Sequence, residues 1–151
     1  MPFLAGRRPT ARQMNTIINS GDLFLSPSFN CTTTTYANFT GGSIVFQKLM
    51  GSSESDLRVR LDASAFLQAS NPVNCTLGVN INSTDYDITY QRFNVTQTHF
   101  CWGRFRRLTG IPAGTYTIQV RAKNDTASRN VEFTGAGSGG QLGMVVEEIL
   151  L

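Results

Sequence analysis

The stretch Leu108–Lys123, LTGIPAGTYTIQVRAK, constrains the fold of this chain more than any other segment. It begins with a turn in which Pro112 fixes one backbone angle, while the glycines around it leave others free. In the segment after the turn, Tyr116 starts a row of apolar residues that alternates with a row of polar ones. This alternation is typical of a β-strand with one buried and one solvated face.

Similar signals recur along the chain. From Asp22 onward they predict strands and no helix. The hairpin turn Asn82–Asp85 joins two of these strands, and we expect Thr98–Leu108 to pair with Tyr116–Lys123. Many short strands between turn signals predict an all-β fold, an antiparallel jelly-roll sandwich of about eight strands. The expected strands are Asp22–Leu25, Cys31–Phe39, Ser43–Leu49, Asp56–Phe66, Cys75–Asn82, Tyr86–Phe93, Thr98–Leu108, Tyr116–Lys123 and Gly143–Leu150.

The first residues differ in composition from the rest. Thr10–Gln13 fits a capping box, and the apolar residues after it have helical spacing, which predicts a short helix over about Ala11–Asn19. A helix this short is unstable alone and needs a partner. We therefore divide the chain into an attachment arm, 1–21, and a jelly-roll domain, 22–151. The candidate attachment residues are Phe3, Leu4, Arg7, Arg8, Met14, Ile17 and Ile18.

Charge and hydropathy argue against two classes of partner. The formal net charge of the 151 residues is only +3, without the concentrated basic face that nucleic-acid domains show. No run approaches the ~20 apolar residues of a membrane helix, and no signal peptide is visible. We expect a protein made in a cytoplasm, with neither nucleic acid nor a membrane as its partner.

The chain offers little catalytic or metal-binding chemistry. Cys31, Cys75 and Cys101 are odd in number and lack CxxC spacing, so we expect three reduced, mostly buried thiols. His99, the only histidine, shares a strand face with Cys101, but no nucleophile elbow accompanies them. Glu147 and Glu148 should point to opposite sides of a strand. We expect no enzyme, no metal and no cofactor.

The glycines of 135–140 satisfy GxGxxG formally. A dinucleotide site needs a helix directly after this motif to bind the pyrophosphate. The apolar run that follows is too short for such a helix. The motif is therefore expected to be a connection between strands.

A stripe of aromatic and basic residues follows His99. If the strand is regular, one face carries Phe100, Trp102, Arg104 and Arg106. Such a stripe suits a single-stranded nucleic acid or a protein partner. The low net charge favours the protein interface, so these four are the candidate interface residues.

Two parts of the chain resemble bacteriophage proteins. The turn and strand at 108–123 resemble a late strand of the trimeric jelly roll of tumour necrosis factor and the complement globular heads. Over Asp56–Glu148, ordered matches such as LGVNINSTDY and RLTGIPAGTYT resemble jelly-roll domains of phage virion proteins. AGRRPTARQMN at the N-terminus is similar to a leader of phage tail-associated proteins.

This resemblance implies a virion structural protein that trimerises and binds other virion proteins, of the tail or the major capsid, through its arm. A minor tail or tail-tip role comes first, because of the leader, and capsid decoration is the alternative. A host-surface glycan is a further candidate partner, with Tyr86, Tyr90 and Trp102 as contacts if exposed. A secreted cytokine-like ligand and a tail glycan hydrolase are the rival classes; the first lacks a signal peptide and the second lacks a catalytic set.

Overall fold

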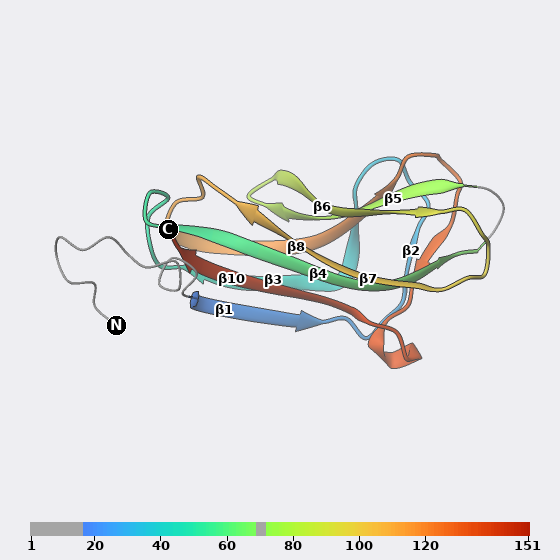
Figure 1. Ribbon diagram of the computed structural model, residues 1–151, viewed down its shortest axis with the longest axis horizontal. Helices are drawn as coiled ribbons and strands as arrows, with labels where there is room; N and C mark the ends of the chain where they lie inside the picture. Colours follow the sequence, from blue (N-terminus) through green and yellow to red (C-terminus); the bar gives the residue numbers. More distant parts are fainter. Residues whose placement is uncertain (1–16, 69–71) are drawn as a thin grey trace.

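Two antiparallel β-sheets packed face to face form the body of the protein in the computed structural model, which describes residues 17–68 and 72–151 (Figure 1). The elements are β1 (Ile17–Phe24), β2 (Phe29–Cys31), β3 (Ala37–Lys48), β4 (Ser55–Leu67), β5 (Val73–Ile81), β6 (Thr84–Phe93), β7 (Phe100–Leu108), β8 (Gly114–Asn124), β9 (Val131–Phe133), a short 3₁₀ turn (Ala136–Ser138) and β10 (Leu142–Leu150).

The order of the strands is that of a jelly roll. One sheet runs β1-β10-β4, with β7 paired to β4 and with β9 and β2 extending it, and the other runs β3-β8-β5-β6. Most strands that follow one another in the chain lie in different sheets, so the connections cross the sandwich. Only β5 and β6, among the described strands, pair with their direct neighbour in sequence. The predicted all-β antiparallel jelly-roll sandwich is confirmed.

The core lies between the inner faces of the two sheets. Leu57, Val59 and Leu61 of β4 are at most 1% exposed, and they alternate with Arg58 and Arg60 on the outside. The inner face of β8 is buried in the same way, and its residues are Tyr116, Ile118, Val120 and Ala122. Period-two alternation thus placed the inner rows correctly from the sequence.

Two turns follow the expected chemistry. Asn82 and Ser83 both have positive φ, +49° and +64°, which is the backbone of a two-residue type I′ hairpin. In the turn before β8, Gly110 has φ +76° and Ile111 is buried. The Tyr116 hydroxyl donates to the Pro112 carbonyl at 2.8 Å, which ties this turn to the strand after it.

The expected helix at Ala11–Asn19 is wrong for residues 17–19, which form a β-strand. Ile17 and Ile18 begin β1, which pairs antiparallel with β10 from Ile17↔Ile149 onward. Residues 17–21, assigned to the arm from the sequence, therefore lie in the sheet. Apolar residues at adjacent positions fit a strand edge as well as a helix, and the open edge of β10 supplies the hydrogen bonds. Positions 11–16 lie outside the described residues.

The expected strand Cys31–Phe39 is also wrong. β2 ends at Cys31, and 32–36 form a loop whose carbonyls at Thr32 and Thr33 accept hydrogen bonds from Ser128 and Asn124. β3 then runs through Gly41 and Gly42, which were expected to bound a strand. Gly41, at φ +70°, makes a bulge there instead.

The predicted pairing of Thr98–Leu108 with Tyr116–Lys123 is wrong as well. β7 pairs with β4, from Leu57↔Leu108 to Ala65↔Phe100, and β8 lies between β3 and β5 in the other sheet. The intervening turn crosses the sandwich instead of folding back in one sheet. Alternation along each strand does not encode this choice of partner.

A buried polar cluster closes one end of the sandwich. Glu148 of β10 is fully buried and accepts hydrogen bonds from the amides of Leu49 and Met50, both at 2.8 Å, and from Ser55 Oγ at 2.6 Å. Lys48 Nζ lies 3.7 Å from the same carboxylate and donates to Ser55 Oγ at 2.6 Å and to the Met50 carbonyl at 2.6 Å. The β3–β4 connection is thereby fixed to the last strand.

The pKa of Glu148 reflects this cluster. Burial by itself raises the pKa, but the hydrogen bonds from Leu49, Ser55 and Met50 and the charge of Lys48 bring it below the ordinary 4.5. A carboxyl with a lowered folded pKa stabilises the fold above its unfolded pKa. This contribution is lost as the pH falls through the folded pKa.

We predict that Glu148→Gln lowers the free energy of unfolding by about 3–5 kcal/mol at neutral pH, because it leaves the Lys48 charge buried and unpaired. Urea unfolding measures this loss. The gap to the wild type should begin to narrow below about pH 4.5, where the carboxyl of the unfolded wild-type chain takes up a proton, and should close as the pH falls through the lower pKa of the folded state.

The neighbouring residue supplies the control. Glu147 lies on the opposite face of β10 and pairs with Arg58 at 2.6 Å, with both side chains partly exposed. Glu147→Gln should change the free energy of unfolding by at most ~1 kcal/mol. Equal losses for the two variants would contradict the role given to the buried cluster.

Candidate functional site: the outer face of the β1-β10-β4-β7 sheet

Three rows of residues cross the outer face of four neighbouring strands. Directly opposed residues of antiparallel strands share a face, so the register defines each row. From β1 through β10 and β4 to β7, the rows are Ser20–Glu147–Arg58–Arg107, Asp22–Val145–Arg60–Phe105 and Phe24–Gly143–Asp62–Gly103. We call this surface the outer face.

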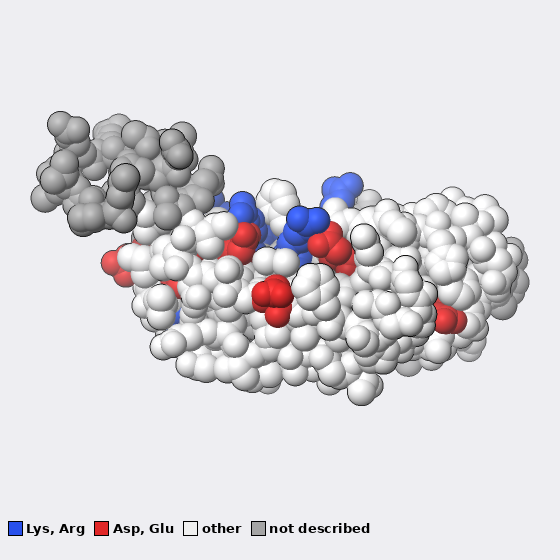
Figure 2. Space-filling view, turned by 90° about the horizontal axis from the view of Figure 1, so that it is seen from below, with Lys and Arg blue, Asp and Glu red and all other residues white. Residues whose placement is uncertain are grey.

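Charged side chains occupy the middle of the outer face as pairs. Arg58 Nε lies 2.6 Å from Glu147, and Arg60 Nη2 lies 2.9 Å from Asp62. Gly103 makes room for the second pair, since a Cβ there would lie 2.0 Å from Asp62 Oδ1. At the edge, Arg107 Nε bonds the nearly buried carboxylate of Asp56 at 2.5 Å. Figure 2, seen from the β1 side, shows basic and acidic side chains together in one group beside uncharged surface.

An open hollow of about 280 Å³ lies beside the Arg60–Asp62 pair. Position 143 is a glycine, so no side chain fills the hollow there. Residues of the β9–β10 connection line another part of it. The hollow is lined by Leu23, Phe24, Arg60, Asp62, Ala136, Gly140, Gln141, Leu142, Gly143, Met144 and Val145.

Two exposed aromatic rings flank the charged group. Phe24 on β1 is 75% exposed and Phe105 on β7 is 66% exposed. Three strand spacings, about 14 Å, separate β1 from β7, and Phe24 lies one row further along the strands than Phe105. The Arg58 guanidinium lies 5.9 Å from the centre of the Phe105 ring. Two large exposed rings around paired charges are typical of a protein contact surface.

The four candidate interface residues of β7 do not act as one stripe. Phe100 and Trp102 are partly buried, and their rings pack on Phe93 with centroids 5.5 and 5.9 Å apart. Arg104 and Arg106 follow on the same side of the strand but are exposed where β7 borders β6. Arg106 Nη1 donates to the Asp87 carbonyl of β6 at 2.5 Å. An interface role for all four stays a prediction.

Sequence reasoning missed the opposite phase of β7. It followed the even-numbered residues because Trp102 and the arginines share them, and so passed over Phe105 between two arginines. The signal was present, since an aromatic residue on the outer row of a strand with a filled inner row must face solvent or a partner. Phe24 was missed because the strand expected there, Asp22–Leu25, is too short for its alternation to show which side faces outward.

The attachment residues Phe3, Leu4, Arg7, Arg8 and Met14 lie outside the described residues. Ile17 and Ile18 lie in β1, where Ile17 is 45% exposed and Ile18 partly buried. Of the expected arm, these two side chains are therefore placed on the sheet next to the outer face.

The residues that the sequence offered as candidates for catalysis or cofactor binding have structural roles of their own. His99 is exposed and its ring packs on Phe66, with centroids 4.5 Å apart, while the exposed Cys101 contacts Ser64 Oγ at 3.5 Å. Residues 135–140 contain the 3₁₀ turn and connect β9 to β10, as expected for a strand connection. Glu147 and Glu148 do point to opposite faces.

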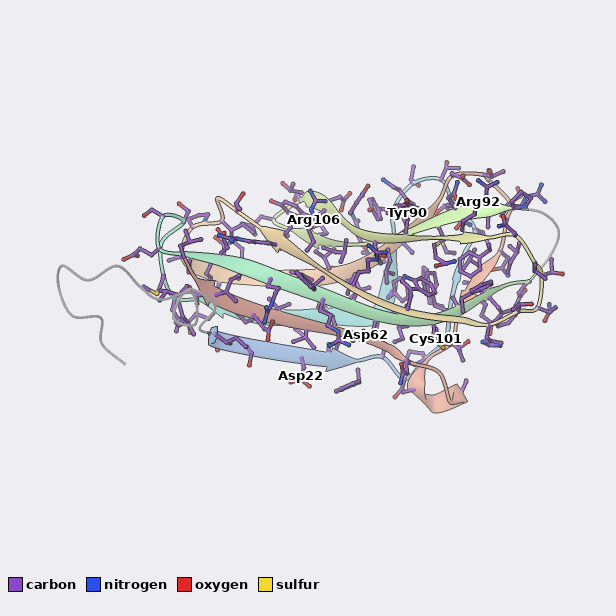
Figure 3. The ribbon with its side chains drawn as sticks, viewed as in Figure 1. Asp22, Asp62, Tyr90, Arg92, Cys101 and Arg106 are labelled. Carbon is purple, nitrogen blue, oxygen red and sulfur yellow. The ribbon has the colours of Figure 1, made fainter. Side chains whose placement is uncertain are left out.

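The proposed glycan contacts divide by exposure. Tyr90, on the other sheet, is 73% exposed, whereas Tyr86 and Trp102 are partly buried against the core. Figure 3 shows Tyr90 and Arg92 on the opposite side of the sandwich from Asp22 and Asp62. Tyr90 alone of the three meets the condition of exposure, and glycan binding stays a prediction.

Residues 17–68 and 72–151 contain neither a cluster of metal-ligating side chains nor a membrane-spanning helix. No group of three or more His, Cys, Asp or Glu side chains in this part of the chain could hold a metal ion. No helix within the same residues is long and apolar enough to cross a membrane.

Comparisons with known proteins give only remote structural similarity. No protein-family model and no curated protein matches the sequence. Among solved structures, dimeric latent PorU from Porphyromonas gingivalis has a TM-score of 0.49 at 11% identity over 99% of this chain, which spans 14% of PorU. Eiger TNF from S. frugiperda has a TM-score of 0.37 at 7% identity, over 83% of this chain and 93% of that one.

A third similar structure is the CBM22-1 xylan-binding domain from Paenibacillus barcinonensis Xyn10C. Its TM-score is 0.41 at 12% identity, over 92% of this chain and 98% of that domain. With TM-scores and identities this low, none of the three carries an argument about what this chain does.

Proposed function

We propose that this chain is a structural protein of a bacteriophage virion, a minor tail or tail-tip component whose jelly roll assembles as a homotrimer. The ordered sequence resemblance over Asp56–Glu148 supports the phage assignment. The proposal includes no catalytic step, because the weighed residues His99, Cys101 and Glu148 are each engaged in packing or in structural hydrogen bonds.

The observation that carries the assembly is the pair of exposed rings, Phe24 and Phe105, on the outer face. Four strands of about nine residues span roughly 19 by 30 Å, a projected area near 600 Å². A standard interface buries about 800 Å² per partner, so the face with its bordering edge is large enough for one. Leaving two phenylalanines in water on an otherwise solvated sheet is unfavourable, and a second copy of the chain would cover them.

A trimer needs two different patches on each copy, because a threefold contact is heterologous. The second patch in this proposal is the exposed β6–β7 edge with Arg104 and Arg106. Among the described residues Arg104 makes no ion pair, and neither does Asp22 on the outer face. Arg104 at the edge of one copy would therefore meet Asp22 on β1 of the next.

We predict that the double variant Phe24→Ser/Phe105→Ser sediments as a monomer at micromolar concentration, whereas the wild type sediments with the mass of three chains. The variant removes most of the apolar contact area while leaving the core intact. Thermal melts should confirm that the variant stays folded.

Tyr90→Ser is the matched control, since it removes a ring of similar size that is 73% exposed on the other sheet. It should leave the trimer unchanged. A wild-type monomer, or equal dissociation by Tyr90→Ser, would contradict the proposed assembly.

Deleting residues 1–16 should leave a folded trimer, because β1 begins at Ile17, yet abolish incorporation into particles. Immunogold labelling of purified phage measures incorporation and location. Label at the tail tip supports the first role, and label on the head would replace it by capsid decoration. Truncated protein that still enters particles would exclude attachment through the arm.

A further inference from the structure

Two buried thiols from opposite sheets meet at the end of the sandwich. Cys31 is the last residue of β2 and Cys75 lies near the start of β5, and both side chains are 0% exposed. Each thiol lies close enough to the other to shift its pKa. In Figure 1, β2 and β5 lie toward the end of the sandwich away from the C-terminus. The sequence predicted thiols without disulfides because nothing in the cysteine spacing indicates this contact.

Backbone contacts hold the two cysteines together independently of the thiols. Asn124 of β8 lies directly opposite Cys75 in the register of the second sheet. The Asn124 side-chain amide donates to the Cys31 carbonyl at 2.8 Å, and the Asn124 backbone amide donates to the Thr33 carbonyl at 2.8 Å. Asn124 thus lies beside Cys75 in the sheet and binds the backbone at Cys31, so the two cysteines are fixed as neighbours.

The local chemistry makes the two thiols unequal. The hydrogen bond from Cys75 lowers the pKa of Cys31, against the effect of burial, and the Thr33 amide lowers it further. The hydrogen bond to Cys31 and burial raise the pKa of Cys75 well above its ordinary value. In thiol–disulfide exchange the thiolate is the attacking species, so these directions favour Cys31 over Cys75 as the attacking thiol.

We propose that Cys31 and Cys75 are a disulfide site that links the two sheets when the chain meets a low-molecular-weight disulfide such as oxidised glutathione. The Cys31 thiolate attacks one glutathione sulfur, forms a mixed disulfide and releases one glutathione thiolate, which takes up a proton. The Cys75 sulfur, losing its proton, then attacks Cys31 and releases the second glutathione. Two protein thiols are oxidised, and one oxidised glutathione is reduced to two thiols.

The native fold favours this bond over free thiols, because it holds as neighbours two residues that are 44 positions apart and would otherwise meet rarely. The exposed Cys101 of β7 contacts Ser64 on the outer side of the sheet that also contains β2, and it takes no part. The inference is independent of the proposed virion function, and its test involves neither trimerisation nor particles.

The test uses the full chain carrying Cys101→Ser, which keeps both buried cysteines. The protein is refolded from urea in glutathione buffers of graded redox ratio, quenched with an alkylating reagent and analysed by peptide mass spectrometry. We expect a Cys31–Cys75 cross-linked peptide pair with the loss of two hydrogen atoms. Half-oxidation of the folded chain should need about a hundred-fold less oxidised glutathione than half-oxidation of the same chain kept in urea.

Free thiols at both positions in every buffer would overturn the inference, and so would the same redox midpoint with and without urea. Glutathione adducts at Cys31 or Cys75 without the cross-link would overturn it as well. The variant Cys75→Ser should accumulate a glutathione adduct at Cys31 when refolded, since the resolving thiol is gone. If this variant does not fold, the redox midpoints of the parent chain decide the question alone.

Discussion

The packing of β4 against the opposite sheet is the interaction on which the rest of this structure depends. Leu57, Val59 and Leu61 are all but inaccessible to water, and β4 is hydrogen-bonded to β10 and β9 along one edge and to β7 along the other. Every strand of the outer face is therefore positioned, directly or through β10, by this strand. The same strand supplies Arg58, Arg60 and Asp62 to the outside, so core and candidate site are two faces of one segment.

Polar contacts secure the two ends that apolar packing leaves open. At one end Glu148 and Lys48 tie the β3–β4 connection to the final strand. At the other, Asn124 ties the loop after β2 to β8 and brings Cys31 to Cys75. Burying an ion pair and an amide is costly unless hydrogen bonds satisfy them, and the multiple bonds to Glu148 meet that condition.

Much of the fold could be predicted from the sequence, because alternation reports which side of a strand is buried. It placed the inner rows of β4 and β8, the β5–β6 hairpin and the opposed directions of Glu147 and Glu148. It did not predict that β7 pairs with β4, since pairing depends on how connections cross the sandwich. The N-terminal helix failed for a related reason: Ile17 and Ile18 took the open edge of β10, which no local pattern reveals.

The candidate site was less accessible to sequence reasoning. Even-numbered residues of β7 were favoured because aromatic and basic residues share that phase, yet Phe100 and Trp102 pack on the core. The outer face is formed by residues from four strands, and only their register brings Phe24, Asp62 and Phe105 onto one surface. Cys31 and Cys75 are also far apart in the sequence, so no local pattern predicts that their thiols are neighbours.

The proposed assembly by contact between the β7 edge and the outer face is tested most directly by charge reversal across that contact. Sedimentation of Asp22→Arg, Arg104→Asp and the double variant separates this contact from general effects of charge. Each single variant should dissociate the trimer, because like charges then face each other, and the double variant should restore it. A double variant that stays dissociated while folded, or single variants that remain trimeric, would contradict the account.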